Sequence, residues 1–236
     1  MARKTKETTV GSQNRTVTPN EAKSAIEHCI KLQRPLMMWG APGIGKSDIV
    51  KQVADSQKRE VIDIRLPLWE PTDIKGIPYY NSQENNMVWA SPAELPTDPK
   101  SNAIVFLDEL NSAAPAVQAA AYQLILNRRV GQYHLPKGVS IVAAGNRDSD
   151  KGVTYRMPAP LANRFVHIEL RVDYDDWLQW ATDIKIHSDV VGYCTFAKQD
   201  LYDFDPRGSS RSFATPRSWS FVSQLLSDDL PESTLT

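Results

Sequence analysis

The sequence predicts an α/β protein in which helices cover both faces of a parallel β-sheet and a small helical domain follows. Three observations support this fold class. Predicted strands and helices alternate from Thr18 onward, and each strand is an almost continuous apolar run. Parallel strands that are buried on both faces have this composition. After Arg171 the strands stop, and amphipathic helical segments follow one another.

The first predicted helix begins with a capping box. Thr18 is the N-cap, Pro19 occupies the first helical position, and Glu21 stands three residues after the cap. The later elements follow from apolar runs and from helical periodicity. We predict strands over 35–40, 61–65, 103–108, 139–146 and 165–170, and helices over 46–56 and 114–129.

The stretch GIPYYNSQENNMVWASP, residues 76–92, interrupts the alternation of strands and helices. Two short apolar runs flank a polar segment, which is typical of a β-hairpin with a polar turn. One interpretation is a surface hairpin whose large side chains pack on the sheet, namely Tyr79, Tyr80, Val88 and Trp89.

Two amphipathic helices are predicted after residue 171, in DDWLQWATDI and in PRSWSFVSQLL. We expect aromatic side chains to fill the core between them, namely Trp177, Trp180, Trp219 and Phe221.

Composition narrows the class of protein. Among 236 residues the formal net charge is −1, so no overall basic field indicates binding to nucleic acid. Cys29 and Cys194 lack a CxxC partner and are expected to be buried thiols in a reducing, cytoplasmic compartment. The four histidines show no zinc-ligand spacing. No apolar run approaches the roughly 20 residues that cross a bilayer, and the basic start lacks the apolar core of a secretory signal.

The segment GAPGIGKS, from Gly40 to Ser47, carries the most specific motif. It fits GxxxxGK[ST] between a predicted strand and a predicted helix, the context that a phosphate-binding P-loop requires. Glycines let backbone N–H groups point at phosphate oxygens, and the helix N-terminus adds partial positive charge. Lys46 is expected to reach the β- and γ-phosphates, and Ser47 to ligate Mg²⁺. The predicted nucleotide-binding residues here are Gly40, Ala41, Pro42, Gly43, Ile44, Gly45, Lys46, Ser47 and Asp48.

Two further apolar strands deliver polar groups to the same sheet edge. The segment AIVFLDEL ends in Asp108 and Glu109, at the strand ends where ligands bind in open α/β folds. We expect Asp108 to hold Mg²⁺ through water and Glu109 to polarise the attacking water. The segment IVAAGNRDSD brings Asn146, whose neutral amide can hydrogen-bond the water or the γ-phosphate.

Two arginines are candidates for sensing or stabilising the nucleotide. Arg164 directly precedes the last predicted strand, and an arginine supplied across a subunit boundary can stabilise charge on a γ-phosphate. Arg217 lies near the start of a helix in the helical domain and could report the nucleotide state to it. For each, an ordinary surface arginine is the alternative.

Together these motifs resemble the AAA+ ATPases, which are P-loop NTPases, and within them the MoxR-like branch of the helix-2-insert clade. The resemblance covers about residues 18–226 and includes PTDIKGIP, VQAAAYQLILNRRVGQYHLPKG and RMPAPLANRF. It implies a three-layer sandwich with sheet order 5-1-4-3-2, ATP with Mg²⁺ as cofactors, and hexameric rings. In its terms Asn146 is sensor 1, Arg164 the arginine finger offered in trans, and Arg217 sensor 2.

The resemblance also implies a division of the chain. Residues 1–16 would form a flexible tail, 17–170 the nucleotide-binding core with the insert hairpin at about 76–92, and 171–236 a helical lid, reduced or truncated. The chain departs from the branch after the Walker B acids. Many MoxR-like proteins carry arginine where this chain has Ser112, and Arg128 and Arg129 are candidates to replace it.

Hydrolysis alone does not name a function. The branch implies a chaperone-like ATPase that remodels, assembles or activates a protein partner, often one with a von Willebrand factor A (VWA) domain. Two alternatives remain open at this point: a nucleic-acid-directed motor or loader, and a nucleotide-gated scaffold with little turnover. The absence of arginine at Ser112 motivates the scaffold, and the polar hairpin tip, with little positive charge, favours a protein client.

Overall fold

A six-stranded parallel sheet forms the centre of the molecule in the computed structural model, which describes residues 15–150, 154–208 and 212–228. Its strands run in the order β1-β10-β2-β9-β6-β3, and all neighbouring strands are parallel. Their bounds are β1 (Arg15–Val17), β2 (Leu36–Trp39), β3 (Val61–Arg65), β6 (Ile104–Asp108), β9 (Ser140–Gly145) and β10 (Val166–Leu170). The five predicted strands thus stand in the expected order 5-1-4-3-2, which is confirmed.

Strand β1 extends this sheet at the edge beside β10. It includes Arg15 and Thr16, which pair with Ile168 and Glu169, so the prediction that the tail reaches residue 16 is wrong by two residues. Three residues are too few to show a period-2 pattern, and only pairing with β10 defines the strand. The rest of the predicted tail, residues 1–14, and the chain end at 229–236 lie outside the described residues.

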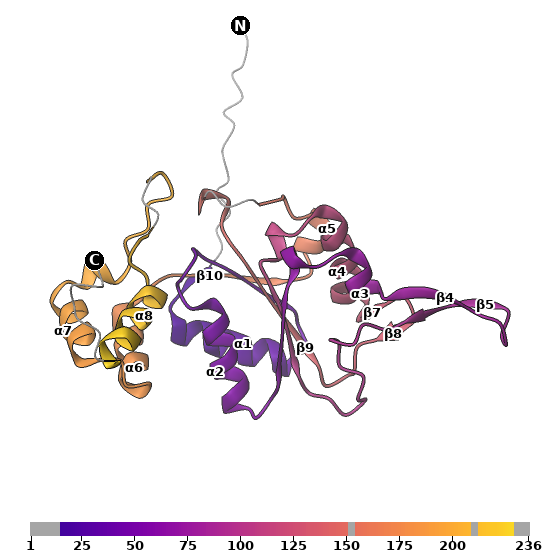
Figure 1. The fold of residues 1–236 in the computed structure, drawn as a ribbon, viewed down its shortest axis with the longest axis horizontal. Helices are drawn as coiled ribbons and strands as arrows, with labels where there is room; N and C mark the ends of the chain where they lie inside the picture. The colour runs from indigo at the N-terminus through magenta and orange to yellow at the C-terminus, as the bar shows by residue number, and fades with distance from the viewer. Residues whose placement is uncertain (1–14, 151–153, 209–211, 229–236) are drawn as a thin grey trace, which may run out of the picture.

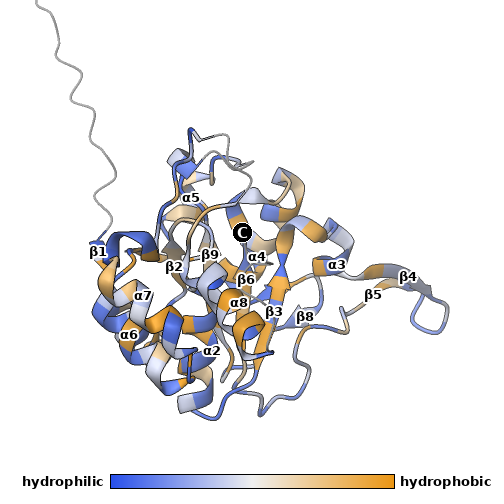
Figure 2. Ribbon diagram, turned by 60° about the vertical axis from the view of Figure 1, so that its left-hand side comes forward, coloured by the Kyte–Doolittle hydropathy of each residue, from blue (hydrophilic) through white to orange (hydrophobic). Residues whose placement is uncertain are grey.

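Helices cover both faces of the sheet (Figure 1). The helices α1 (Pro19–Lys31) and α2 (Lys46–Ser56) lie on one face, and α3 (Pro71–Lys75), α4 (Pro115–Asn127) and α5 (Ala159–Ala162) lie on the other. Successive strand residues alternate between the two cores, as the period of a strand requires. In β6, Ile104 and Phe106 join the core under α1 and α2, whereas Val105 and Leu107 join the core under α4. The central strands are accordingly hydrophobic along their length (Figure 2).

The capping box at the start of α1 is confirmed. The Thr18 hydroxyl accepts a hydrogen bond from the N–H of Glu21, and the Glu21 carboxylate accepts one from the N–H of Thr18. These bonds satisfy backbone donors that a helix leaves unpaired at its first turn. Within the described ranges, no helix is long and apolar enough to cross a membrane.

The predicted hairpin is formed by β4 (Ile77–Asn81) and β5 (Asn86–Ala90), which pair antiparallel and project from the body of the molecule (Figure 1). Tyr79 and Tyr80 are 52% and 65% exposed, so they do not pack on the sheet. A second, shorter hairpin of β7 (Arg129–Val130) and β8 (Tyr133–His134) was not predicted, because two-residue strands carry no periodicity.

A helical unit follows the sheet and consists of α6 (Tyr174–Asp183), α7 (Ser188–Phe196) and α8 (Pro216–Ser227). Its own core is formed by Trp177, Ala181, Val190, Cys194 and Leu201, and Trp180 and Trp219 pack against it. The prediction that Phe221 fills this core is wrong, since Phe221 is 54% exposed. The inward stripe of α8 is instead made by Trp219, Val222, Ser223 and Leu226, at helical spacing, which turns Phe221 away.

Candidate functional site

The turn between β2 and α2 depends on two glycines with positive φ. Gly43 has φ +77°, and Gly45, the N-cap of α2, has φ +91°. L-residues with a side chain rarely adopt this region, so glycine is the residue that suits both positions. α2 then runs for eleven residues, and its first turn leaves backbone N–H groups without intrahelical partners. This turn therefore has the features of an anion-binding site at a helix N-terminus.

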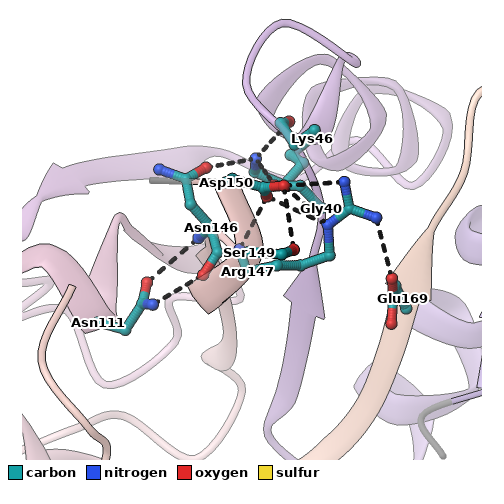
Figure 3. Close-up of polar contacts among 9 residues, drawn as sticks. Gly40, Lys46, Asn111, Asn146, Arg147, Ser149, Asp150 and Glu169 are labelled. Atoms are coloured by element: carbon teal, nitrogen blue, oxygen red, sulfur yellow. Dashed lines mark hydrogen bonds and ion pairs between the residues drawn. The ribbon is translucent and has the colours of Figure 1, made fainter. Parts of the chain in front are cut away.

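Lys46, the first residue of α2, extends back across the turn. Its Nζ donates to the carbonyl oxygens of Gly40 at 2.6 Å and Ala41 at 3.0 Å, and to Oδ1 of Asn146 at 3.1 Å (Figure 3). Burial lowers the pKa of Lys46 to about 8, although the carboxylates of Asp108 and Asp150 oppose that shift. The ammonium is therefore poorly solvated, and an anionic ligand would favour its charged form.

The carboxyl ends of three neighbouring strands meet at this turn. β2, β9 and β6 are adjacent and parallel. Gly40 and Asn146 follow β2 and β9, and Asp108 is the last residue of β6, so all three lie at the same end of the sheet. Here lies an open pocket of about 380 Å³. Its lining residues are Pro42, Gly43, Gly45, Lys46, Ser47, Asp108, Glu109, Asn146 and Arg217, all of them predicted from the sequence.

The two acids at the end of β6 have different environments. Asp108 is buried, with 7% of its surface exposed, and its Oδ1 accepts a hydrogen bond from the N–H of Glu109 at 2.9 Å. Glu109 has φ +55°, an uncommon left-handed conformation for a residue other than glycine. Such backbone strain clusters at functional sites. The chain thus turns sharply after the buried acid, and both residues line the pocket.

A magnesium ion fits the donor set of this pocket. The Ser47 hydroxyl and the Asp108 carboxylate supply hard oxygen ligands, and Mg²⁺ is commonly held by one or two protein groups together with phosphate and water. Among the described residues, no group of three or more His, Cys, Asp or Glu could hold a metal ion. Phosphate oxygens and water would therefore have to complete its coordination.

A second, more apolar pocket of about 570 Å³ lies against the other side of the P-loop helix. Ile44 and Asp48 line this pocket and are absent from the lining of the smaller one, whereas Gly45 and Arg217 line both. It lies where the core meets the helical unit, and its remaining lining includes Pro19, Lys23, Ile49, Gln52, Val172, Asp173, Asp176, Trp177, Trp180, Pro216 and Ser220. The two pockets together offer a polar and an apolar compartment side by side.

Arg217 reaches the site from the first turn of α8. Arg217 lines both pockets. Burial is the largest cause of the lowered pKa of Lys46, and the positive charge of Arg217 lowers that pKa further. The backbone N–H of Arg217 donates to the carbonyl of Gly43 at 3.2 Å. The helical unit therefore contacts the P-loop directly.

Arg164 is not brought to this pocket. It is exposed and stands two residues before β10, which runs parallel to β2. The amino end of β10 lies at the edge opposite to the P-loop, so Arg164 cannot share the pocket of its own chain without a rearrangement of the sheet.

Sequence reasoning missed several residues around Asn146. Asn111 is 1% exposed and bonds to the backbone of Asn146. Arg147 donates to the carboxylates of Asp150 and Glu169, at 2.9 and 3.1 Å in the closest pairs, which ties the loop to β10 (Figure 3). The only sequence feature that could have identified Asn111 as part of the site is its position two residues after Glu109.

The two arginines proposed to replace the one missing at Ser112 differ. Arg128 is engaged in structure, since its Nη2 donates to the carbonyls of Pro136 and Val139 at 2.7 Å each. Burial lowers its pKa. Arg129 is exposed, in β7. Of these two, Arg129 is the one on the surface.

Comparisons with known proteins agree with this geometry. Midasin from Giardia intestinalis is 29% identical over 174 residues, which cover 68% of this chain and 4% of the midasin. Among solved structures, a mutant of RuvB from Thermotoga maritima has a TM-score of 0.56 at 17% identity, and the match covers 89% of this chain and 61% of the RuvB chain. NtrX from Brucella abortus has a TM-score of 0.53 at 13% identity, and the match covers 88% of this chain and 48% of the NtrX chain. These structures share the fold, and this chain spans less than two thirds of each relative.

Residues 35–167, more than half of the chain, match the ATPase family associated with various cellular activities (AAA). The match begins just before β2 and ends within β10, so it contains the P-loop, the acids after β6 and the loop after β9. Membership in this family implies nucleotide binding. The chain therefore belongs to the AAA family of ATPases.

Proposed function

We propose that this protein binds ATP together with Mg²⁺ and hydrolyses the bond to the γ-phosphate. The observation that carries the proposal is the single pocket that gathers Lys46, Asp108, Glu109 and Asn146 above a glycine-rich turn. An ammonium, two carboxylates and a neutral amide at a helix N-terminus are the groups that phosphoryl transfer uses. The apolar pocket beside it, with Ile44, Trp177 and Trp180, suits the nucleoside part of the same ligand.

Each polar group in the pocket would have a separate role. Lys46 would exchange the carbonyls of Gly40 and Ala41 for phosphate oxygens, and Glu109 would orient the attacking water. Asn146 would hydrogen-bond that water or the γ-phosphate. Bound magnesium would neutralise charge on the phosphates, with Ser47 as a direct ligand and Asp108 acting through water.

The protein would act as one subunit of a MoxR-like ring, with six subunits the expected number. Arg164 is exposed at the sheet edge opposite its own P-loop, which favours a role at a neighbour's nucleotide. An arginine supplied in trans can raise turnover by roughly 10³-fold or more. The helical unit would then be the lid, and Arg217 would report the nucleotide state to it.

A protein client is favoured by the projecting hairpin. Residues 77–90 carry one charged side chain, Glu84, and expose Ile77, Tyr79, Tyr80 and Met87. Such a surface suits contact with a polypeptide and offers no positive charge to a nucleic-acid backbone. We therefore propose remodelling or activation of a protein partner, with a VWA-domain protein as the candidate, in the cytoplasm.

Two substitutions test the enzymatic proposal. Lys46→Ala should abolish ATP binding, because the phosphates lose their main cation, and Glu109→Gln should bind ATP normally and turn it over at least a hundredfold more slowly. Glu84→Gln, the same change on the exposed hairpin, is the control and should match wild type. Binding is measured with a fluorescent ATP analogue and turnover by phosphate release, with and without Mg²⁺. Wild-type turnover in Glu109→Gln would refute the role of Glu109, and binding without turnover in the wild type would favour the scaffold.

A further inference from the structure

We infer that Asn111 is a positioning residue, which fixes the loop after β9 to the carboxylate end of β6 so that Asn146 faces Lys46. The inference rests on the proposed ATPase function, for which it names an additional residue. Asn111 lies in the 3₁₀ turn η2 (Leu110–Ser112), directly after Glu109. It does not line the pocket itself.

The Asn111 carboxamide forms two hydrogen bonds with one peptide segment. Its Nδ2 donates to the carbonyl of Asn146 at 2.8 Å, and its Oδ1 accepts from the N–H of Asn146 at 3.2 Å (Figure 3). A side chain that is 1% exposed and paired through both donor and acceptor holds its partner in one orientation. The backbone of Asn146 is therefore set by a residue from another strand's end.

The backbone of Asn111 holds the far end of the same loop. Its carbonyl accepts a hydrogen bond from the N–H of Tyr155 at 2.7 Å. Asn146 and Tyr155 mark the two ends of the segment that includes Arg147 and Asp150, so one residue ties both ends to η2. The side chain of Asn111 thus binds the backbone of Asn146, and its backbone carbonyl binds the N–H of Tyr155.

The approach of Asn111 requires a glycine at the end of β9. A Cβ on Gly145 would stand 2.4 Å from Oδ1 of Asn111 and 2.6 Å from Cε of Met37. Real Cβ atoms do not come so close, so any side chain at position 145 would displace the Asn111 carboxamide. The sequence therefore contains two residues, Asn111 and Gly145, that make this contact possible.

Asn111 thus joins the turn after the acids of β6 to the backbone of Asn146. Glu109 and Asn111 are separated by one residue, and the Oδ1 of Asn146 accepts from Lys46 at 3.1 Å. A shift of about 1 Å in a positioned group can cost on the order of a hundredfold in rate. Loss of the Asn111 carboxamide should thus lower turnover while leaving the phosphate-binding turn intact.

The test uses Asn111→Leu, which replaces the carboxamide by an apolar group of similar size, and Gln118→Leu as its matched control. Gln118 is also a buried amide, 2% exposed, and its Nε2 donates to the carbonyl of Ala113 at 3.0 Å. We expect Asn111→Leu to lower kcat of the full chain by about tenfold to a hundredfold and to leave the Kd of an ATP analogue within about threefold. Gln118→Leu should keep wild-type kcat.

A double-mutant cycle with Asn146→Ala separates positioning from general destabilisation. If Asn111 acts through Asn146, adding Asn111→Leu to Asn146→Ala should lower kcat little further, whereas independent losses would multiply. Multiplying losses, or wild-type kcat in Asn111→Leu, would overturn the inference.

Hydrogen exchange supplies a second readout, which does not depend on ATP turnover. The amide of Asn146 loses its acceptor, Oδ1 of Asn111, and should therefore exchange faster in Asn111→Leu and at the wild-type rate in Gln118→Leu. Unchanged exchange in Asn111→Leu would overturn the inference even if the wild type proved unable to hydrolyse ATP. Absence of wild-type turnover would refute the proposed function separately.

Discussion

The backbone N–H of Arg217 donates a hydrogen bond to the carbonyl of Gly43, with 3.2 Å between nitrogen and oxygen. This bond joins the first turn of α8 to the centre of the P-loop. Thr215, the buried N-cap of α8, packs closely on the same turn, since a Cβ on Gly43 would stand 2.8 Å from the Thr215 hydroxyl oxygen. The orientation of the helical unit is therefore coupled to the conformation of the phosphate-binding turn.

Gly43→Ala should lower the melting temperature of the ligand-free protein more than Gly45→Ala does. Both glycines have positive φ, so alanine has a similar backbone cost at each, about 1 kcal/mol. A Cβ at position 45 meets nothing within 4 Å, whereas one at position 43 meets the Thr215 side chain. Thermal unfolding followed by circular dichroism measures the difference. Equal melting temperatures for the two variants would show that α8 does not press on the turn.

Arg164→Ala should lose most of its ATPase activity, because no arginine would then stabilise the charge that develops on the γ-phosphate at the neighbouring subunit's site. Mixing it with Lys46→Ala subunits should restore turnover, since an intact P-loop then meets an intact arginine. Random assembly predicts roughly a quarter of the wild-type rate at equal proportions.

The matched control for this experiment is Arg34→Ala. Arg34 is exposed and lies just before β2, near the sheet edge that carries Arg164. It should retain wild-type turnover. If no mixing ratio restores activity to Arg164→Ala, the arginine does not act across a subunit boundary.

The hairpin should tolerate substitution of an exposed tyrosine without loss of stability. Tyr79→Thr keeps a strand-forming residue at a position that is 52% exposed, and should change the free energy of unfolding by less than about 0.5 kcal/mol. Trp89→Thr is the comparison, because the Trp89 side chain is half-buried at the hairpin base. Its backbone N–H, which donates to Oε1 of Gln132, is kept in this variant. Trp89→Thr should cost about 1 kcal/mol or more in urea unfolding. Equal losses would mean that Tyr79 packs in solution.

Apolar runs predicted the sheet well because its strands are buried on both faces. The ends of β2, β6, β9 and β10 each lie within one residue of the predicted ranges, and α2 has the predicted bounds. The P-loop could be predicted for a different reason, because its glycines and Lys46 lie in one short contiguous segment of the sequence. Neither reason applies to β1, whose three residues are defined by pairing with β10 alone.

The residues that sequence reasoning missed depend on contacts between distant segments. Asn111 and Asn146 are 35 positions apart, and nothing in either segment shows that the Asn111 side chain meets the backbone of Asn146. Arg147 and Glu169 meet only because β10 lies next to β2 and Arg147 reaches across from the loop after β9. Phe221 was wrongly predicted to be buried because the prediction considered its apolar side chain and not the face of α8 on which it lies. Such contacts follow from packing rather than from local pattern.

ATP binding should take up a proton at alkaline pH. In the free protein burial lowers the pKa of Lys46 to about 8, so the amine is mostly charged at pH 7 and mostly neutral at pH 9. Bound phosphates favour the charged amine and raise that pKa. Uptake should therefore be close to zero at pH 7 and approach one proton at pH 9, while affinity falls as pH rises through 8.

Isothermal titration calorimetry in buffers of different ionisation enthalpy measures this uptake directly. Lys51→Ala is the control, because Lys51 lies on the exposed side of α2 and should leave the proton uptake unchanged. Hydrolysis is suppressed by using a non-hydrolysable ATP analogue, which leaves the charge on the phosphates in place. Equal proton uptake at pH 7 and pH 9 would show that Lys46 is charged in the free protein across this range, and that the carboxylates of Asp108 and Asp150 outweigh its burial.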